Sequence, residues 1–361
     1  MRRASGWLFA LLGLGLLLIW LGVRENPTAG QDRVVVAFLD VGQGDALLVR
    51  SPEGKTALID AGPSRQIVPL LERRGVTSID LVVVSHHHDD HYGGMDDVVR
   101  RFRPRVFLAS DSSYTSERYL KLLELVRDRR IPAISPTGSA RKLGLGSVVL
   151  TVFPRAPADP DEENNNSVGL RLQYGGFSVL LPGDAEGPER RWWEENMPSL
   201  CADATVLKLA HHGSRSGTDA TWLKLVRPQL AVASMGRDNE FGHPHPQTLA
   251  LLKRFEIPLL RTDRDGTIVI QSDGARWSVV DHRHASPQTT LAPARTRCPD
   301  AQVHINQADE GELSTAPGFG PVLVRRMIAH RPFQDVDDLG RVEGGIGETR
   351  LSRLRPLVVV E

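Results

Sequence analysis

The chain has 361 residues, which is enough for one large domain and a smaller one. Lysine plus arginine and aspartate plus glutamate number 44 each, so the chain has no formal net charge. Because proteins that hold nucleic acid by bulk charge are usually basic, this balance argues against a large electrostatic surface for DNA. The two cysteines, Cys201 and Cys298, are too few for a disulfide framework and leave open whether they pair.

An uncharged, leucine-rich stretch from Ala4 to Val23 follows two arginines at the N-terminus. Such a stretch is either a secretory signal peptide or a single membrane span. It is longer than a usual signal sequence and a cleavage site at residues 28–30 is poor, so we favour an uncleaved anchor over residues 1–24. The arginines would then stay in the cytoplasm and the rest of the chain would lie outside it. Cleavage would instead secrete the protein.

From Val34 onward, short β-rich runs alternate with amphipathic helical stretches. The runs that predict strands are 34–41, 45–50, 55–60, 79–85, 105–109, 147–153, 169–175, 177–184, 203–211, 230–235, 257–262 and 266–271. The patterns that predict helices are 67–75, 95–102, 116–130, 186–196 and 245–255. Many strands with a few interspersed helices predict a mixed α/β layered domain over residues 33–282.

The chain changes character after this domain. Residues 283–302 have no periodicity and contain several prolines, alanines and threonines, which predicts a linker. Residues 303–361 hold two glycine-rich turns, PGFGP and VEGGIGE, each leading into a helical stretch. We therefore predict a separate small unit with a weak internal repeat.

The densest chemical signal is SHHHDDHYGG, which follows the apolar run LVVV. The pattern H-x-H-x-D-H is formed by His86, His88, Asp90 and His91. In this pattern His86 and His88 bind one ion, and Asp90 and His91 face a second. Imidazole and carboxylate together suit zinc, manganese or iron. The pattern predicts a site for one or two divalent ions, and ions held in this way activate water for hydrolysis at neutral pH.

The large domain resembles the metallo-β-lactamase superfamily, and more narrowly the hydrolase domain of ComEC-type DNA-uptake proteins. The matching stretches are FLDVGQGDALLV, ALIDAG, SHHHDDHYGG, NNNSVGLRLQYG, LLPGDAE, LKLAHHGS and GRDNEFGHPHP. The resemblance implies an αββα sandwich with a metal site between its two sheets. Asp40, Gln43 and Asp45 lie in a characteristic turn to which we assign no chemistry.

The resemblance also implies roles for single residues. Asp184 matches the aspartate that bridges both ions, and His211 matches the late histidine that completes the shell of the second ion with Asp90 and His91. Asp90 and Asp184 are expected to orient the attacking water as catalytic residues.

Three further residues take supporting roles by the same resemblance. Asp60 matches an early aspartate that supports the histidine loop by hydrogen bonds. His212 is the less expected ligand of its pair and is assigned a contact with substrate instead. His243, in the loop GHPHP, is expected to stabilise charge on the departing group.

The chain departs from the broader superfamily in one place. The superfamily carries a further histidine before the bridging aspartate, as a third ligand of the first ion, but here that region reads ADPDEENNNSV. The ion at His86 and His88 is thus short of a ligand unless Asn165, Asn166 or water supplies one.

The C-terminal unit resembles the tandem helix-hairpin-helix module of DNA-binding competence proteins. Gly318 and Gly320 lie in its first hairpin, and Gly345 and Gly347 in its second, which has an extra glycine. Glycines in such hairpins let backbone N–H groups reach DNA phosphates, which gives binding without sequence preference. Acidic residues outnumber basic ones in this unit, so a module for protein contacts is the alternative.

Together these features predict a membrane-anchored, extracytoplasmic hydrolase with one or two zinc or manganese ions. Its expected substrate is a phosphodiester, most simply single- or double-stranded DNA, and other DNA-uptake proteins are its expected partners. Two alternatives remain open. The protein hydrolyses other phosphoesters, such as phosphocholine on cell-surface polymers, or it is a DNA tether without catalytic activity.

Overall fold

The computed structural model describes most of the large predicted domain and part of the small one. The described residues are 32–113, 116–281, 292–293, 303–307, 313, 321–342 and 358–359. None of the helices within these ranges is both long and apolar enough to cross a membrane. The stretch predicted as an anchor, residues 1–24, lies outside the described residues.

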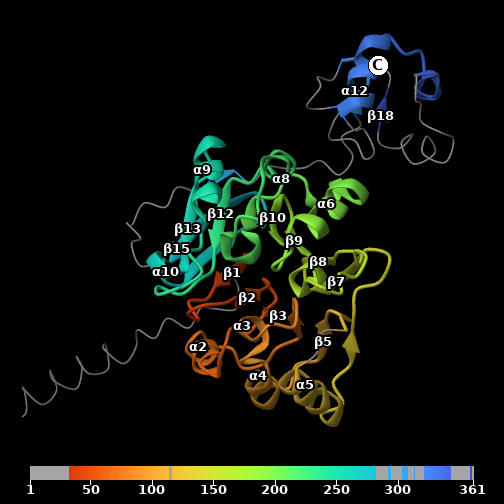
Figure 1. The fold of residues 1–361 in the computed structure, drawn as a ribbon. Coiled ribbons are helices and arrows are strands. Elements are labelled where there is room, and N and C mark those ends of the chain that lie inside the picture. Colours follow the sequence, from red (N-terminus) through yellow and green to blue (C-terminus); the bar gives the residue numbers. More distant parts are fainter. Residues whose placement is uncertain are drawn as a thin grey trace, which may run out of the picture. The chain divides into compact units, whose positions relative to one another are not determined.

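Two mixed sheets form the centre of the large domain (Figure 1). The first sheet has nine strands in the order β16-β15-β14-β1-β2-β3-β4-β5-β6. In chain order they are β1 (Val34–Phe38), β2 (Leu47–Arg50), β3 (Thr56–Ile59), β4 (Leu81–Val84), β5 (Val106–Ala109), β6 (Ala133–Ile134), β14 (Ile268–Ser272), β15 (Arg276–Asp281) and β16 (Ala292–Pro293). Strands β3 to β6 run parallel to one another.

The second sheet has seven strands in the order β13-β12-β11-β10-β9-β8-β7. They are β7 (Arg141–Leu145), β8 (Val148–Val152), β9 (Leu170–Tyr174), β10 (Phe177–Leu181), β11 (Val206–Lys208), β12 (Leu230–Ala233) and β13 (Leu259–Arg261). Strands β10 to β13 are parallel, and β7 to β10 are antiparallel.

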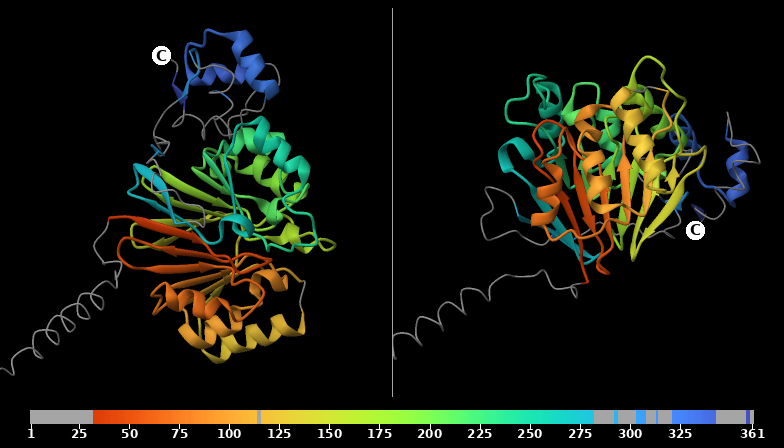
Figure 2. Two further views of the ribbon diagram at one scale, coloured as in Figure 1. Left: turned by 90° about the vertical axis from the view of Figure 1, so that its left-hand side faces the viewer. Right: turned by 90° about the horizontal axis from the view of Figure 1, so that it is seen from below.

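Helices cover the outer face of each sheet (Figure 2). On the first sheet lie α2 (Ile67–Arg73), α4 (Met95–Phe102) and α5 (Glu117–Asp128), and on the second lie α6 (Gly187–Asn196), α8 (Ala220–Val226) and α9 (Pro246–Arg254). Shorter helical turns are α3 (Asp89–Tyr92), α7 (Pro198–Cys201), α10 (Thr262–Asp265), η1 (Glu163–Asn166) and η2 (Ala210–Gly213). This arrangement confirms the predicted αββα sandwich.

Residue alternation along the strands explains the layers. In β1, Val34, Val36 and Phe38 pack between the sheets, whereas Ala37 and the following Leu39 pack against the helices of the first sheet. Successive side chains of a strand point to opposite faces, so a strand that is apolar at every position can support a core on both sides. The site described below lies where the loops at one edge of both sheets meet.

Part of the small C-terminal unit is also described. It contains α12 (Pro321–His330), η3 (Val336–Arg341) and a short parallel pairing of β17 (Val303–His304) with β18 (Val358–Val359). Its hairpin glycines, Gly318, Gly320, Gly345 and Gly347, lie outside the described residues. Within the stretch predicted as a linker, residues 292–293 pair with β15.

Candidate metal centre

The residues predicted to bind metal lie in loops that follow strands of both sheets. They are His86 and His88 after β4, Asp90 and His91 in α3, Asp184 after β10, and His211 after β11. Because parallel strands bring their carboxyl ends to one edge of a sheet, residues far apart in sequence meet there.

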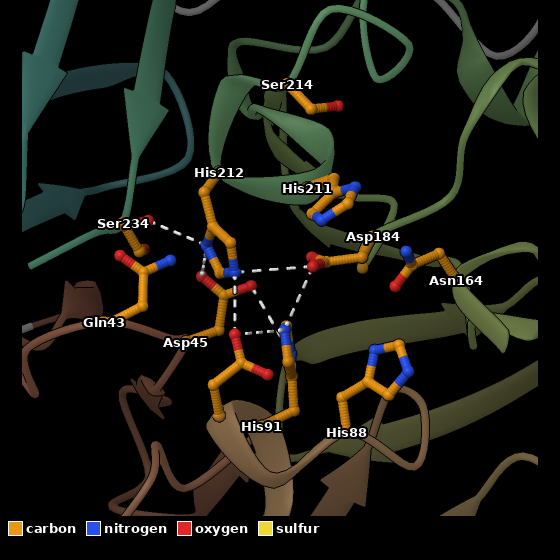
Figure 3. Close-up of polar contacts among 12 residues, drawn as sticks. Gln43, Asp45, His88, His91, Asn164, Asp184, His211, His212, Ser214 and Ser234 are labelled. Carbon is orange, nitrogen blue, oxygen red and sulfur yellow. Dashed lines mark hydrogen bonds and ion pairs between the residues drawn. The ribbon is translucent and has the colours of Figure 1, made fainter. Parts of the chain in front are cut away.

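The centre of this site is a buried cluster around Asp184 (Figure 3). Its Oδ2 lies 3.2 Å from Nε2 of His91 and 3.4 Å from Nε2 of His212. Nε2 of His212 also lies 3.1 Å from Oδ2 of Asp90, which joins the two sheets. Ligand atoms of His86, His91 and Asp184 lie within 4.8 Å of one another, as do those of Asp90, His91 and His212.

Hydrogen bonds behind the rings fix which nitrogen of each histidine faces the cluster. Nδ1 of His212 donates to the carbonyl oxygen of Ser234 at 2.8 Å, and Nδ1 of His91 donates to Oδ2 of Asp60 at 2.9 Å. With Nδ1 engaged in this way, Nε2 of each ring faces Asp184 and is the nitrogen that can bind an ion, and bonds of this kind are how proteins orient metal-binding histidines. Asp60 also accepts from the backbone N–H and the hydroxyl of Ser85, each at 2.7 Å.

His86 and His88 form the other side of the site. Nε2 of His86 lies 3.0 Å from Nδ1 of His88, while Nδ1 of His86 lies 3.1 Å from the hydroxyl of Ser85. Two ring nitrogens that face one another suit either one shared proton or one shared cation. Nitrogen and carboxylate donors in two adjoining groups fit one or two divalent ions such as zinc or manganese.

A buried ion pair that the sequence did not reveal lies behind Asp184. Nζ of Lys208 lies 3.0 Å from Oδ1 of Asp184, donates to the carbonyl oxygen of Gly183 at 2.9 Å, and pairs with Asp45. Burial alone would lower the pKa of Lys208, but the two carboxylates raise it above its ordinary value. Lys208 therefore stays charged and holds one oxygen of Asp184 away from the histidines.

Charge neighbours keep Asp184 ionised in the same way. Burial disfavours the carboxylate, yet His91, Lys208 and His212 lower the pKa of Asp184 well below its usual range. Asp90 behaves alike, because His91 and His212 lower its pKa against the effect of burial. Both carboxylates are therefore available as negatively charged ligands at neutral pH.

Comparison with known families agrees with this chemistry. The model described as the metallo-beta-lactamase superfamily matches residues 39–237, more than half of the chain. The chain belongs to the metallo-β-lactamase superfamily. A second model, described as a helix-hairpin-helix motif, matches residues 299–359. The large domain is thus a metal-dependent hydrolase fold, and the small one carries a helix-hairpin-helix motif.

Several curated relatives have names that refer to competence or recombination. ComE operon protein 3 of Bacillus subtilis is 30% identical over 64% of this chain and 32% of the relative. Competence protein ComA of Neisseria gonorrhoeae is 29% identical over 71% of this chain and 36% of its own length. Recombination protein 2 of Haemophilus influenzae is 30% identical over 70% of this chain and 31% of its own length. The matched part is thus about a third of each relative.

In this metallo-β-lactamase site the two neighbouring histidines take different positions. His211 and His212 both have positive φ, at 46° and 53°, and this left-handed turn sends their rings in different directions. His212 is buried among the ligand atoms. His211 is partly exposed, and its Nδ1 lies 2.8 Å from Oε1 of Glu186. The sequence prediction made His211 the ligand, whereas the geometry favours His212.

Substitution can separate the two histidines. His212→Ala is expected to weaken metal binding by about 10- to 100-fold or more, because the ring supplies a donor inside the cluster. His211→Ala, a neighbour of the same type, is expected to keep the affinity within a few fold. Calorimetric titration of each metal-free variant with Mn²⁺ would measure this, and a larger loss in His211→Ala would contradict the assignment.

His243 lies at the rim of the superfamily site. Its ring centroid is 5.4 Å from that of His211 and 6.4 Å from that of His212. Burial, followed by these neighbouring rings, lowers the pKa of His243 to about 4, so the ring is neutral at pH 7. Asn239 holds its backbone, because Oδ1 accepts from the N–H of His243 at 2.9 Å and Nδ2 donates to its carbonyl oxygen at 3.0 Å.

The remaining members of the histidine motif have structural roles, and sequence reasoning had left them out of the ligand set. His87 stacks on Tyr119 with ring centroids 3.9 Å apart, and its backbone N–H donates to Glu163 at 2.9 Å. Asp89 is exposed and lies 3.5 Å from Arg118. Glu163 was missed, although a carboxylate beside an asparagine run is a visible signal.

The turn that bears Asp45 brings the two sheets together. Gly44 has a φ of +121°, and a Cβ there would lie 2.0 Å from the carbonyl oxygen of Asp90, so only glycine fits. The N–H of Asp45 donates to that same oxygen at 3.2 Å, and Gln43 accepts from the N–H of Gly236 at 3.2 Å. The turn therefore fixes both the histidine motif and the carboxylate that pairs with Lys208.

Proposed function

We propose that the protein is a metal-dependent phosphodiesterase that cuts DNA in connection with DNA uptake. The observation that carries this proposal is the presence, in one chain, of a hydrolase cluster around Asp184 and a helix-hairpin-helix motif over residues 299–359. The names of the relatives, which refer to competence and recombination, support the same substrate.

The chain's own residues would divide the work at this site. Divalent ions held by these residues would activate a water for attack and polarise the phosphoryl oxygens. Asp184 and Asp90 hold negative charge on the two sides of the cluster, and His91 and His212 direct Nε2 into it. Lys208 fixes the orientation of Asp184. His243 is neutral and near the rim, where its ring donates a hydrogen bond to the departing oxygen.

One exposed aromatic side chain also fits a nucleic-acid substrate. Phe241 is 68% exposed and packs its ring against His243 with centroids 6.0 Å apart and planes 27° apart. An exposed aromatic ring at the edge of a phosphodiesterase site offers a stacking surface for a base. This position would favour substrates with an unpaired base next to the cleaved phosphate.

The proposal includes a location and partners. An anchor over residues 1–24 would hold the hydrolase outside the cytoplasm, where incoming DNA arrives, and other DNA-uptake proteins would act beside it. Localisation of a fluorescent fusion and protease accessibility of intact cells would test this placement. Degradation of the large domain only in lysed cells would contradict it.

Purified protein loaded with Mn²⁺ or Zn²⁺ should cut single- or double-stranded DNA, and a chelator should stop the reaction. If the protein hydrolyses phosphocholine esters and leaves DNA intact, it is instead a hydrolase of other phosphoesters. Intact DNA under every metal, together with retained DNA binding, would favour the tether. The same preparation therefore decides among the three.

Removal of the C-terminal unit should weaken DNA binding. A chain that ends at Asp281 lacks the helix-hairpin-helix motif, and loss of its phosphate contacts should both lower the affinity and flatten its salt dependence. We expect a loss of about tenfold at low salt, with each lost contact removing about 0.9 from the slope of log affinity against log salt. Fluorescence anisotropy at several salt concentrations measures both, and an unchanged slope would exclude a role in phosphate binding.

A further inference from the structure

We propose that Asn164 supplies the third protein donor, through its side-chain amide oxygen, to the cation at His86 and His88. Nε2 of His86 and Nδ1 of His88 lie 3.0 Å apart. A cation bound to these two nitrogens needs a further ligand from the protein or from water. The sequence pointed to Asn165, Asn166 or water, and the structure distinguishes among the asparagines.

Asn165 and Asn166 use their amides in hydrogen bonds to Asp159 in their own loop and to the backbone of Glu186. Nδ2 of Asn165 donates to Asp159 at 2.8 Å, and its Oδ1 accepts from the N–H of Glu186 at 3.2 Å. Nδ2 of Asn166 donates to the carbonyl oxygen of Asp159 at 2.8 Å, and its Oδ1 accepts from the N–H of Asp159 at 3.0 Å. The amide oxygens of both side chains therefore already accept a hydrogen bond from a backbone N–H.

Asn164 differs from both neighbours. It is 6% exposed, and its Oδ1 is buried without a hydrogen-bond partner among the described residues. A buried carbonyl oxygen that lacks a donor costs free energy, and protein structures usually complete such a group with water or a cation. The oxygen of Asn164 is thus an available acceptor in the loop that faces the site.

Contacts on both sides place Asn164 at the cluster. The preceding residue, Glu163, accepts from the backbone N–H of His87 at 2.9 Å, and His87 lies between the two histidines of the pair. On the other side, the hydroxyl of Ser167 donates to the carbonyl oxygen of Asn164 at 2.9 Å and accepts from the N–H of Asp184 at 3.1 Å. Figure 3 shows the Asn164 amide on the same side of the site as His88 and Asp184.

An amide oxygen changes which cation the pair prefers. Imidazole nitrogen suits zinc, whereas carbonyl and carboxylate oxygens suit harder ions such as Mn²⁺. A site of two imidazoles and one amide oxygen should therefore hold Mn²⁺ better, relative to Zn²⁺, than the same site with a third imidazole.

The test is metal binding by the full-length, metal-free protein, measured by calorimetric titration and by metal content after dialysis. Asn164→Ala should weaken one class of Mn²⁺ site by about tenfold or more. Asn164→Asp, which keeps an oxygen donor, should retain it. Asn164→His should shift the preference toward Zn²⁺ in a competition between the two ions. Asn196→Ala is the matched control, because Asn196 is exposed on α6.

Mn²⁺ binding by Asn164→Ala with the stoichiometry and affinity of the wild type would overturn the proposal. If that variant does not fold, as judged by circular dichroism, metal binding by Asn164→Asp and Asn164→His tests the proposal instead. An unchanged Mn²⁺/Zn²⁺ preference in Asn164→His would then overturn it. The titration contains no DNA, so its outcome is independent of whether the protein cuts DNA.

Discussion

Replacing Asp184 with asparagine is expected to lower the rate of phosphodiester hydrolysis by about 10³-fold or more. The asparagine keeps the shape and still accepts a hydrogen bond from Lys208, but it removes the negative charge that faces His91 and His212. Metal content should fall together with the rate, because a neutral amide binds a divalent ion less tightly than a carboxylate does. Steady-state kinetics on a DNA oligonucleotide, with metal analysis of the same sample, measures both quantities.

Asp128→Asn is the control for this substitution, since Asp128 is exposed at the end of α5 and pairs with the neighbouring Arg127. It should leave both the rate and the metal content unchanged. Full activity in Asp184→Asn would show that the cluster around Asp184 is not the reaction centre. A lowered melting temperature in that variant would have to be separated from the loss of activity by assays well below the transition.

Lys208→Met is expected to reduce the free energy of unfolding by about 3–5 kcal/mol in metal-free protein. Nζ lies 3.0 Å from Asp184 and pairs with Asp45, and both carboxylates are buried. Removing one member of a buried ion pair leaves the other charge without compensation, which costs more than the lost attraction. Urea denaturation followed by tryptophan fluorescence measures the change. Addition of Mn²⁺ should restore part of it, because a dication compensates the same carboxylates.

Lys121→Met provides the matched control. Lys121 is exposed on α5 and pairs with Glu117 one helical turn away, and such surface pairs contribute about 0.3–0.5 kcal/mol. The control should therefore differ little from the wild type. If the free energy of unfolding of Lys208→Met lies within about 1 kcal/mol of the wild-type value, the charges of Asp45 and Asp184 must be compensated by groups other than Lys208.

The apolar strands and amphipathic helices were predictable, because burial imposes a period on the sequence. Five patterns predicted α2, α4, α5, α6 and α9. Strand β7 was missed because it lies at an edge of its sheet, where its residues RKLGL are mostly exposed and show no apolar alternation. The short helix α8, residues 220–226, was also missed, although Asp219 caps it by accepting from the N–H of Trp222 at 2.9 Å.

The details of the site were harder to predict, because they depend on backbone direction rather than residue type. A left-handed turn decides which of His211 and His212 enters the cluster, and adjacent identical residues give no sign of it. Lys208 could have been noticed as one charge within an apolar strand. Asn164 differs from its neighbours only by hydrogen bonds that form in the folded loop.

The most direct test of the account is the dependence of DNA cleavage on bound metal. Metal-free protein would be titrated with Mn²⁺, and both the occupancy and the cleavage rate of a DNA oligonucleotide would be followed in the same samples. We predict no cleavage without metal and a rate that rises with occupancy until the cluster around Asp184 is filled. Cleavage that is independent of metal, or intact DNA at full occupancy, would contradict the assignment of a metal-dependent nuclease.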